Sequence, residues 1–395
     1  MTKFFHNCTL VLPDQLLANG ALLVDAGKIS WLGLEPDAPK VTNAEKIDCS
    51  GHYLAPGFID VHAHGGGGGS FMNPVAEDYA KGFRMHLEHG VTSLTPTPIV
   101  HSADEMKQHV AAVRGMAGRE NLPHFLGFFL EGPYMADDPA KGKELATESE
   151  FAKADPALYQ AIVTAAEGTI VRWMAAPELP GVLEFGRAIR KLGIIPCIGH
   201  SQATFTEVKA AKLAGFSSVI HLYSVMSTVT RQGGFRRGGV VEAALLLDDL
   251  DVEIIADGCH LPPELISLAV KCIGYDRLML VSDATSLAGY PDGEYEMEIF
   301  GKTMKIILED GVSKSPDRKF FAGSIASGDR LVRTVCQQAG QPLWAAVRML
   351  TRNPAHHLGL SGRKGELVIG ADADLVLLDD AIRTQAVFLS GRQVI

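Results

Sequence analysis

The sequence predicts an α/β fold, an eight-stranded parallel (β/α)8 barrel of the TIM type with a small β-sandwich domain formed by both chain ends. Eight short apolar segments, rich in β-branched and aromatic residues, recur near residues 58–62, 91–95, 124–130, 169–175, 194–198, 218–221, 251–256 and 278–282. Stretches of helical periodicity separate most of them, and strands that alternate with helices indicate parallel βαβ units. The two chain ends alternate apolar and polar residues instead, which is typical of a small antiparallel sheet.

Along the chain, the first 54 residues carry turn signals at residues 26–28 and 35–37, as between strands of a β domain. The barrel is expected over residues 55–359. Residues 360–395 repeat the alternating pattern of the N-terminus, so residues 1–54 and 360–395 are expected to form one domain. A further β-like stretch, about residues 293–321, predicts a hairpin inserted after the eighth strand.

The clearest βαβ unit runs from residue 194 to residue 221. Its first strand ends at His200, and Thr204 with Glu207 three positions later predicts a capping box at the start of a helix. Gly215 can take the left-handed conformation that ends a helix. A second helix is expected over residues 76–89.

Composition narrows the class of protein. A chain of 395 residues with 47% hydrophobic and 21% charged residues is typical of a globular protein with a large core. The net charge of −10 argues against nucleic acid and anionic membranes as partners. The six cysteines form no C-x-x-C pair, which favours reduced thiols and a cytoplasmic location. With no signal-peptide core and no apolar run of about 18 residues, no membrane span is expected.

Six side chains suited to metal binding and proton transfer follow the ends of predicted strands. They are His62, His64, Glu131, His200, His221 and Asp283. Sites in parallel α/β barrels are built at the C-terminal ends of the strands. Imidazole and carboxylate groups are ligands of zinc, and a catalytic zinc keeps an open position for water. The pattern therefore predicts a metal-dependent hydrolase.

Local context favours this interpretation over chance. His62 and His64 are two residues apart, a spacing that places both rings on one face of a strand. The glycines at 65–69 either allow close approach of backbone to a metal or substrate, or form a flexible surface loop. Glu131 ends an apolar segment, where a carboxylate is costly unless it is paired or binds a cation. A solvent-facing Glu131 is the alternative.

Asp283 is expected to act as the general acid and base. A carboxylate beside bound zinc can take the proton of an activated water and hand it to the leaving group. Asp257 competes for this role, although capping the turn at Gly258 explains it better. His86 and His89, at the polar end of the helix predicted over residues 76–89, are expected to face solvent.

These motifs resemble the N-acetylglucosamine-6-phosphate deacetylases of the amidohydrolase superfamily. The resemblance lies in Pro56-Gly-Phe-Ile-Asp-Val-His-Ala-His, Leu130-Glu-Gly-Pro-Tyr, Gly199-His-Ser-Gln-Ala-Thr, Ala256-Asp-Gly-Cys-His and Val281-Ser-Asp-Ala-Thr. It implies a barrel with an appended β-sandwich, a divalent ion such as zinc held by Glu131, His200 and His221, and Asp283 as general acid and base. Some members of the family lack the H-x-H pair, and its presence here favours a second ion.

The resemblance also implies a substrate shell. His260 and Arg231 would engage a sugar phosphate, with Arg231 reaching in from a neighbouring subunit, so a homodimer is expected. Ser224 and Val225 stand where the family usually has Asn-Ala, and Glu144 stands in place of a family histidine. The predicted metal ligands thus match those of the family, whereas the predicted substrate-binding residues differ.

The predicted function is metal-dependent hydrolysis of the acetamide of an N-acetylated hexosamine 6-phosphate, giving acetate and the amino sugar phosphate. The sequence leaves open the glucosamine or the galactosamine isomer, and one or two metal ions. The first alternative is an amidohydrolase that acts on another N-acyl substrate, such as an N-acyl amino acid or a cyclic amide. The second is a non-catalytic barrel that serves as a binding or assembly protein.

Overall fold

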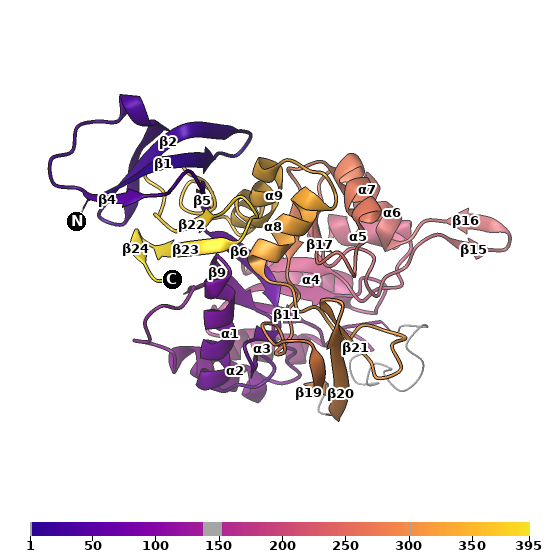
Figure 1. Cartoon of the computed structure of the whole chain (residues 1–395). Coiled ribbons are helices and arrows are strands. Elements are labelled where there is room, and N and C mark those ends of the chain that lie inside the picture. Colours follow the sequence, from indigo (N-terminus) through magenta and orange to yellow (C-terminus); the bar gives the residue numbers. More distant parts are fainter. Residues whose placement is uncertain (1, 137–151, 300–301) are drawn as a thin grey trace.

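The computed structural model describes residues 2–136, 152–299 and 302–395, and every predicted core segment contains a strand (Figure 1). In chain order these strands are β6 (Phe58–Ala63), β9 (Val91–Pro96), β10 (His124–Phe125) with β11 (Phe128–Glu131), β12 (Ile170–Ala175), β13 (Ile195–Ile198), β14 (Ser218–Val219), β17 (Asp251–Ile255) and β18 (Leu278–Val281). Their side chains are largely buried on both faces, as expected for parallel strands covered by helices.

The core strands form two parallel sheets. One has the order β10-β9-β6 and the other the order β11-β12-β13-β14-β17-β18. Backbone hydrogen bonds also join residues just outside some of these strands to neighbouring strands. The amide of Asp283 donates to the carbonyl of His62 at 2.9 Å, and the amide of Leu126 donates to the carbonyl of Leu94 at 3.0 Å. The fold is mixed α/β, and its parallel sheets are consistent with a TIM-like barrel.

Helices connect the strands and cover the sheets. They are α1 (Ala76–Glu88), α2 (Ala103–Arg114), α3 (Pro156–Ala165), α4 (Val182–Lys191), α5 (Phe205–Leu213), α6 (Val240–Leu246), α7 (Pro263–Ile273), α8 (Gly328–Gln337), α9 (Leu343–Leu350) and α10 (Arg352–His357). The capping box of Thr204 and Glu207 starts α5, as predicted. Within the described ranges, no helix is both long and apolar enough to cross a membrane.

The expectation that His86 faces solvent is wrong. Its side chain is fully buried, and Nε2 donates to the carbonyl of Gly65 at 3.0 Å. The short antiparallel pair β7 (Gly65–Gly66) and β8 (Gly69–Ser70) packs on this face of α1. His89 is half exposed and lies 3.2 Å from Asp329.

The glycines at 65–69 serve this packing rather than a loose surface loop. A Cβ atom on Gly69 would lie 2.0 Å from the carbonyl oxygen of Asp78 in α1, and a Cβ atom on Gly65 would lie 2.3 Å from the carbonyl oxygen of Gly69. Both distances are far below van der Waals contact, so only glycine fits at these two positions.

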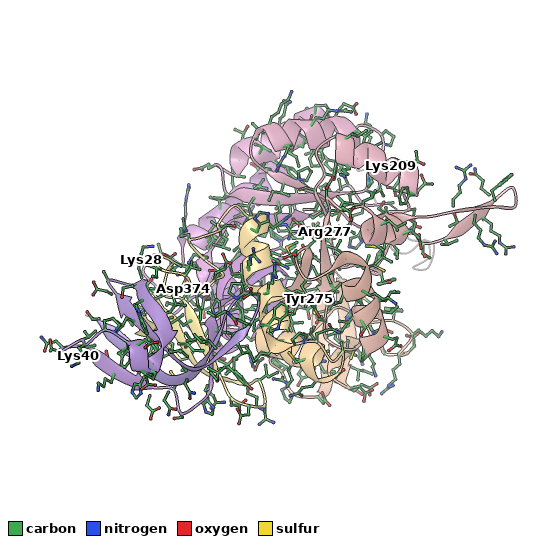
Figure 2. All side chains as sticks on the ribbon, turned by 90° about the horizontal axis from the view of Figure 1, so that it is seen from above. Lys28, Lys40, Lys209, Tyr275, Arg277 and Asp374 are labelled. Carbon is green, nitrogen blue, oxygen red and sulfur yellow. The ribbon has the colours of Figure 1, made fainter. Side chains whose placement is uncertain are left out.

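Both chain ends contribute to one eight-stranded sheet, which contains the first and the last strands of the chain. Its strands are β1 (Lys3–Val11), β2 (Leu16–Asp25), β3 (Lys28–Leu34), β4 (Glu45–Asp48), β5 (Tyr53–Pro56), β22 (Leu375–Leu378), β23 (Thr384–Leu389) and β24 (Arg392–Gln393), with the 3-10 turn η1 (Glu35–Asp37) after β3. The two ends meet where β22 pairs antiparallel with β5. Figure 2 shows Lys28 and Asp374 in this same part of the molecule. Asp374 forms a buried ion pair with Lys364 at 2.5 Å.

Two further β elements flank the core. The predicted insertion after β18 is a three-stranded antiparallel sheet of β19 (Gly293–Ile299), β20 (Lys302–Glu309) and β21 (Val312–Lys314). The sequence did not predict the second element, a hairpin of β15 (Thr230–Gln232) and β16 (Phe235–Arg237). All its residues are exposed, and it projects away from the core strands (Figure 1).

Candidate metal centre and active site

The structure brings together all six side chains that the sequence singles out at strand ends. His62 and His64 come from the end of β6, and Glu131 is the last residue of β11. His200, His221 and Asp283 follow β13, β14 and β18 within two residues of each strand end. Because these strands are parallel, their C-terminal ends lie at the same edge of the sheets.

Glu131 lies at the centre of this cluster. Its Oε1 atom is 2.8 Å from Nε2 of His200 and 2.9 Å from Nε2 of His221. Its Oε2 atom is 2.8 Å from Nε2 of His64 and 3.3 Å from Nε2 of His62. One buried carboxylate therefore contacts two pairs of imidazoles, one pair through each oxygen.

Asp283 adds a second carboxylate on one side only. Its Oδ1 atom is 3.1 Å from Nε2 of His64 and 3.4 Å from Nε2 of His62. Two sets of donor atoms result, each with all its atoms within 4.8 Å of one another. The first set is His62, His64, Glu131 and Asp283, and the second set is Glu131, His200 and His221.

The donor chemistry of both sets fits a divalent metal. The Nε2 atoms of His200 and His221 are 3.3 Å apart and both face the same carboxylate oxygen. A buried carboxylate is stable only when it is paired or binds a metal. Ring nitrogens and a carboxylate oxygen that face one point are the ligands that zinc binds in proteins. Each set could hold one ion, and Glu131 is common to both.

Charge interactions among these groups are strong because the cluster is shielded from water. Burial alone would raise the pKa of Glu131, but the charge of His62 and hydrogen bonds from neighbouring imidazoles hold that pKa well below its ordinary range. Burial disfavours the charged ring of His64, yet the hydrogen bonds that this ring donates to Asp283 and Glu131 outweigh it and raise the pKa of His64 to about 9. Burial likewise opposes ionisation of Asp283, but the charges of His62 and His64 lower its pKa to about 2.

The backbone at the site is strained. His200, His221 and Asp283 have φ angles of 44°, 29° and 48°. Residues other than glycine rarely adopt positive φ, and such strain gathers at functional sites, where surrounding structure must hold it. Three of the six clustered residues share this feature, which indicates that the positive φ angles orient these side chains toward the cluster.

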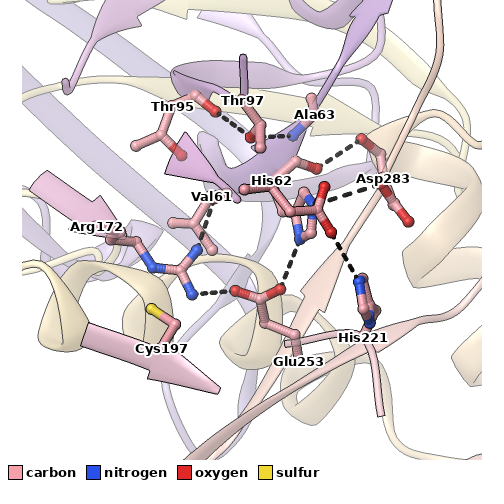
Figure 3. Close-up of polar contacts among 12 residues, drawn as sticks. Val61, His62, Ala63, Thr95, Thr97, Arg172, Cys197, His221, Glu253 and Asp283 are labelled. Atoms are coloured by element: carbon pink, nitrogen blue, oxygen red, sulfur yellow. Dashed lines mark hydrogen bonds and ion pairs between the residues drawn. The ribbon is translucent and has the colours of Figure 1, made fainter. Parts of the chain in front are cut away.

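The sequence did not single out two buried residues behind the cluster, of which Glu253 contacts His62 and Arg172 pairs with Glu253. Glu253 on β17 places Oε2 2.9 Å from Nδ1 of His62, and its Oε1 atom accepts a hydrogen bond from Arg172 on β12 (Figure 3). Both residues lie inside buried strands, at Ile-Val-Arg-Trp and Asp-Val-Glu-Ile. The sequence does contain a signal for both residues, because each is a charged residue within an otherwise apolar strand.

Asp257 caps the turn after β17, as predicted. Its Oδ1 atom accepts hydrogen bonds from the amides of Cys259 and His260, both at 2.8 Å. Its Oδ2 atom lies 2.7 Å from Nδ1 of His260, so Asp257 also orients this ring. The His260 ring contacts the ring of Phe321, with 4.9 Å between centroids.

The other predicted substrate residues lie on three separate segments of the chain. Ser224 and Val225 are half-buried in the turn after His221, and Val225 has a φ of 48°, which is unusual for a β-branched residue. Arg231 lies on the exposed hairpin of β15 and β16, away from the cluster of its own chain (Figure 1). Glu144 lies outside the described residues.

A parallel α/β scaffold that gathers four histidines and two carboxylates at its strand ends has the architecture of a metal-dependent hydrolase. The Amidohydrolase family model matches residues 53–395. An N-acetylgalactosamine-6-phosphate deacetylase of Escherichia coli is 30% identical, covering 99% of both chains. The human N-acetylglucosamine-6-phosphate deacetylase is 31% identical, covering 99% of this chain and 95% of the relative.

Solved structures agree with these comparisons. N-acetylglucosamine-6-phosphate deacetylase from Pasteurella multocida superposes with a TM-score of 0.87 at 28% identity, covering 100% of this chain and 99% of that one. A mutant of the Mycobacterium smegmatis enzyme in complex with N-acetyl-D-glucosamine-6-phosphate gives a TM-score of 0.86 at 27% identity, with 100% and 99% covered. The chain belongs to the amidohydrolase family, among the N-acetylhexosamine-6-phosphate deacetylases.

Metal binding to the metal-free protein should release protons. With a pKa of about 9, His64 is charged at about pH 8 in the absence of metal, and an imidazole must lose its proton to bind an ion. Titration calorimetry with zinc in two buffers of different ionisation enthalpy should show proton release at about pH 8. The release due to His64 should diminish as the pH rises through its pKa, and His64→Gln should release fewer protons. Identical heats in both buffers would contradict the charged state of the cluster.

Proposed function

We propose that the protein hydrolyses the acetamide of an N-acetylhexosamine 6-phosphate, releasing acetate and the amino sugar phosphate. The observation that carries this proposal is the position of Asp283 beside the cluster centred on Glu131, in a chain that aligns end to end with deacetylases of that class. None of the relatives reported above favours an N-acyl amino acid or a cyclic amide as substrate. A purely binding role is disfavoured because all six donor residues are present.

The metal would be held by Glu131 with His200 and His221, and by Glu131 with His62 and His64, which leaves Asp283 of the first donor set for proton transfer. We propose zinc, with two ions when both sets are filled. A divalent ion bound there supplies Lewis-acid chemistry, which polarises an amide carbonyl and makes water more acidic.

Asp283 would move the proton. Its Oδ1 atom lies 3.1 Å from Nε2 of His64, beside the donor sets, so the carboxylate is placed to accept the proton of the attacking water. The water oxygen forms a bond to the carbonyl carbon of the acetamide. Asp283 then gives the proton to the nitrogen as the carbon–nitrogen bond breaks, so acetic acid and the free amine leave, and the acid loses its proton to give acetate. The carboxylate returns to its starting state.

The substrate shell would use His260 for the sugar phosphate, with Ser224 and Val225 lining the sugar. The half-buried turn that carries Ser224 and Val225 directly follows His221, which supports this position. The names of the relatives include both the glucosamine and the galactosamine isomers. The structure of the Mycobacterium smegmatis relative with N-acetyl-D-glucosamine-6-phosphate supports a phosphorylated amino sugar as ligand.

We also propose that the two parallel sheets close into one barrel over residues 55–359, and that residues 1–54 with 360–395 form a separate β-sandwich domain. The hydrogen bond from the Asp283 amide to the His62 carbonyl, which links the segment after β18 to β6, supports closure. The shared terminal sheet supports the separate domain. The six free thiols support the reducing environment of the cytoplasm.

The proposed activity is tested by measuring acetate release from N-acetylglucosamine 6-phosphate, N-acetylgalactosamine 6-phosphate and the same sugars without phosphate. We expect rapid release from at least one phosphorylated sugar and a much lower kcat/KM for its phosphate-free form. Release from N-acyl amino acids alone would refute the proposed substrate class. Equal rates with and without phosphate would refute phosphate recognition.

Asp283→Asn should retain bound metal but lose turnover by a factor on the order of 10² or more, because an amide cannot accept the proton of the attacking water. Elemental analysis and steady-state kinetics measure the two quantities. Asp248→Asn is the control, since Asp248 is 95% exposed and precedes β17, at the opposite end of the strands from the cluster. Turnover of Asp283→Asn near that of the wild type would show that another group is the base.

Arg231 is expected to complete the active site of a partner subunit in a homodimer, because it is exposed on a hairpin that projects from its own chain. Arg231→Ala should then raise KM for the phosphorylated sugar, and Arg237→Ala on the same hairpin serves as control. Mixed dimers of Arg231→Ala and Asp283→Asn chains should regain activity, because one chain retains Asp283 and the other supplies Arg231. A mixture that stays as inactive as its parents would contradict the shared site.

A further inference from the structure

A buried pair of opposite charges lies directly behind the metal-ligand cluster. The side chains of Glu253 and Arg172 are both 0% exposed. Glu253 Oε1 accepts a hydrogen bond from Nη2 of Arg172, and Oε2 contacts Nδ1 of His62 at 2.9 Å (Figure 3). Neither residue touches the atoms that would hold metal, and neither is used in the mechanism above.

This contact determines which nitrogen of His62 carries the proton. A carboxylate that faces a guanidinium is ionised and can only accept hydrogen bonds. Nδ1 of His62 must therefore be the donor. The lone pair of a neutral His62 ring is then on Nε2, the atom that faces Glu131 and Asp283 at 3.3 and 3.4 Å.

Arg172 is itself fixed from two other strands. Its Nη1 atom donates to the carbonyl of Val61 at 2.8 Å, next to His62 on β6. Its guanidinium carbon is 4.3 Å from the ring centroid of Phe129, the register partner of Arg172 on β11. The Phe129 ring in turn meets the His62 ring edge-on, with 4.8 Å between centroids. Groups from β11, β12 and β17 thus fix one imidazole on β6.

Two other histidines of the cluster, His64 and His221, have weaker support at Nδ1. Nδ1 of His64 contacts the carbonyl oxygen of Thr97 at 2.7 Å, and Nδ1 of His221 has no hydrogen-bond partner in the described part of the chain. A carboxylate that accepts the hydrogen bond of a metal-binding imidazole fixes the tautomer of the ring. It also makes the other ring nitrogen a stronger metal ligand than a neutral carbonyl acceptor would. Among these three rings, only His62 has such a carboxylate.

We propose that Glu253 is a positioning residue for the metal centre: held by Arg172, it fixes the proton and the orientation of His62, so that binding of the ion at His62 and His64 depends on it. This inference rests on the proposed metal site. The ion at His200 and His221 depends less on Glu253, because the ring that Glu253 contacts, His62, belongs to the other donor set.

The test uses two variants and a matched control. Glu253→Gln removes the charge but leaves Arg172 without a counterion inside the protein, which is itself destabilising. Arg172→Met combined with Glu253→Met removes both charges together and leaves His62 without an acceptor, so this double variant decides the question if Glu253→Gln fails to fold. Asp374→Asn is the control, because it breaks another buried ion pair, with Lys364, just before β22 of the terminal sheet and outside the cluster.

Metal affinity is measured without substrate, by chelator competition with zinc and by the visible spectrum of the cobalt-loaded protein. We expect the affinity for one ion to fall by roughly 10- to 100-fold in both Glu253 variants, with an altered cobalt spectrum, while Asp374→Asn binds like the wild type. A folded double variant that binds every ion with wild-type affinity and shows an unchanged spectrum overturns the proposal.

The two proposals fail in distinguishable ways. A wild-type protein that binds metal with the predicted dependence on Glu253, but releases no acetate from any hexosamine phosphate, refutes the proposed function and leaves the role of Glu253 intact. Acetate release by the wild type, together with unchanged metal affinity and spectrum in the double variant, refutes only the role of Glu253.

Discussion

The buried carboxylate of Glu131 is the group on which the rest of the site depends. A carboxylate removed from water is unfavourable by several kcal/mol unless it is compensated. Here the compensation comes from four imidazoles on three different strand ends, two for each oxygen. Any rearrangement of these strands would leave the charge unpaired, so the fold and the site constrain each other.

Parallel strands make this convergence possible, because residues hundreds of positions apart arrive at one edge of the sheets. The local backbone contributes as well. Positive φ angles at His200, His221 and Asp283 turn the chain where the strands end. The hydrogen bond from the Asp283 amide to the His62 carbonyl joins the first and last of these strand ends. The strained backbone is thus held by the same contacts that assemble the cluster.

Much of the fold and of the cluster could be predicted from the sequence, because the relevant signals are local. Strand periodicity placed His62 and His64 on one face, and the apolar run before Glu131 indicated an unusual carboxylate. The capping box at Thr204 located the start of α5 within one residue.

The features that could not be predicted depend on contacts between distant segments. Glu253 and Arg172 are charged residues within apolar strands, but their link to His62 is visible only when β12 and β17 are brought next to it. His86 is on the polar end of α1, and only the packing of the glycine turn over that face buries it. The hairpin around Arg231 is polar and exposed, so no apolar pattern indicated its strands.

The most direct test of the central claim is a crystal structure of the zinc-loaded protein with anomalous diffraction measured at the zinc absorption edge. We expect a strong anomalous peak that contacts Glu131 together with His200 and His221, and a second one beside His62 and His64 if both donor sets are filled. Zinc bound elsewhere, with Glu131 still paired directly to its four histidines, would contradict the assignment of this cluster as the metal centre.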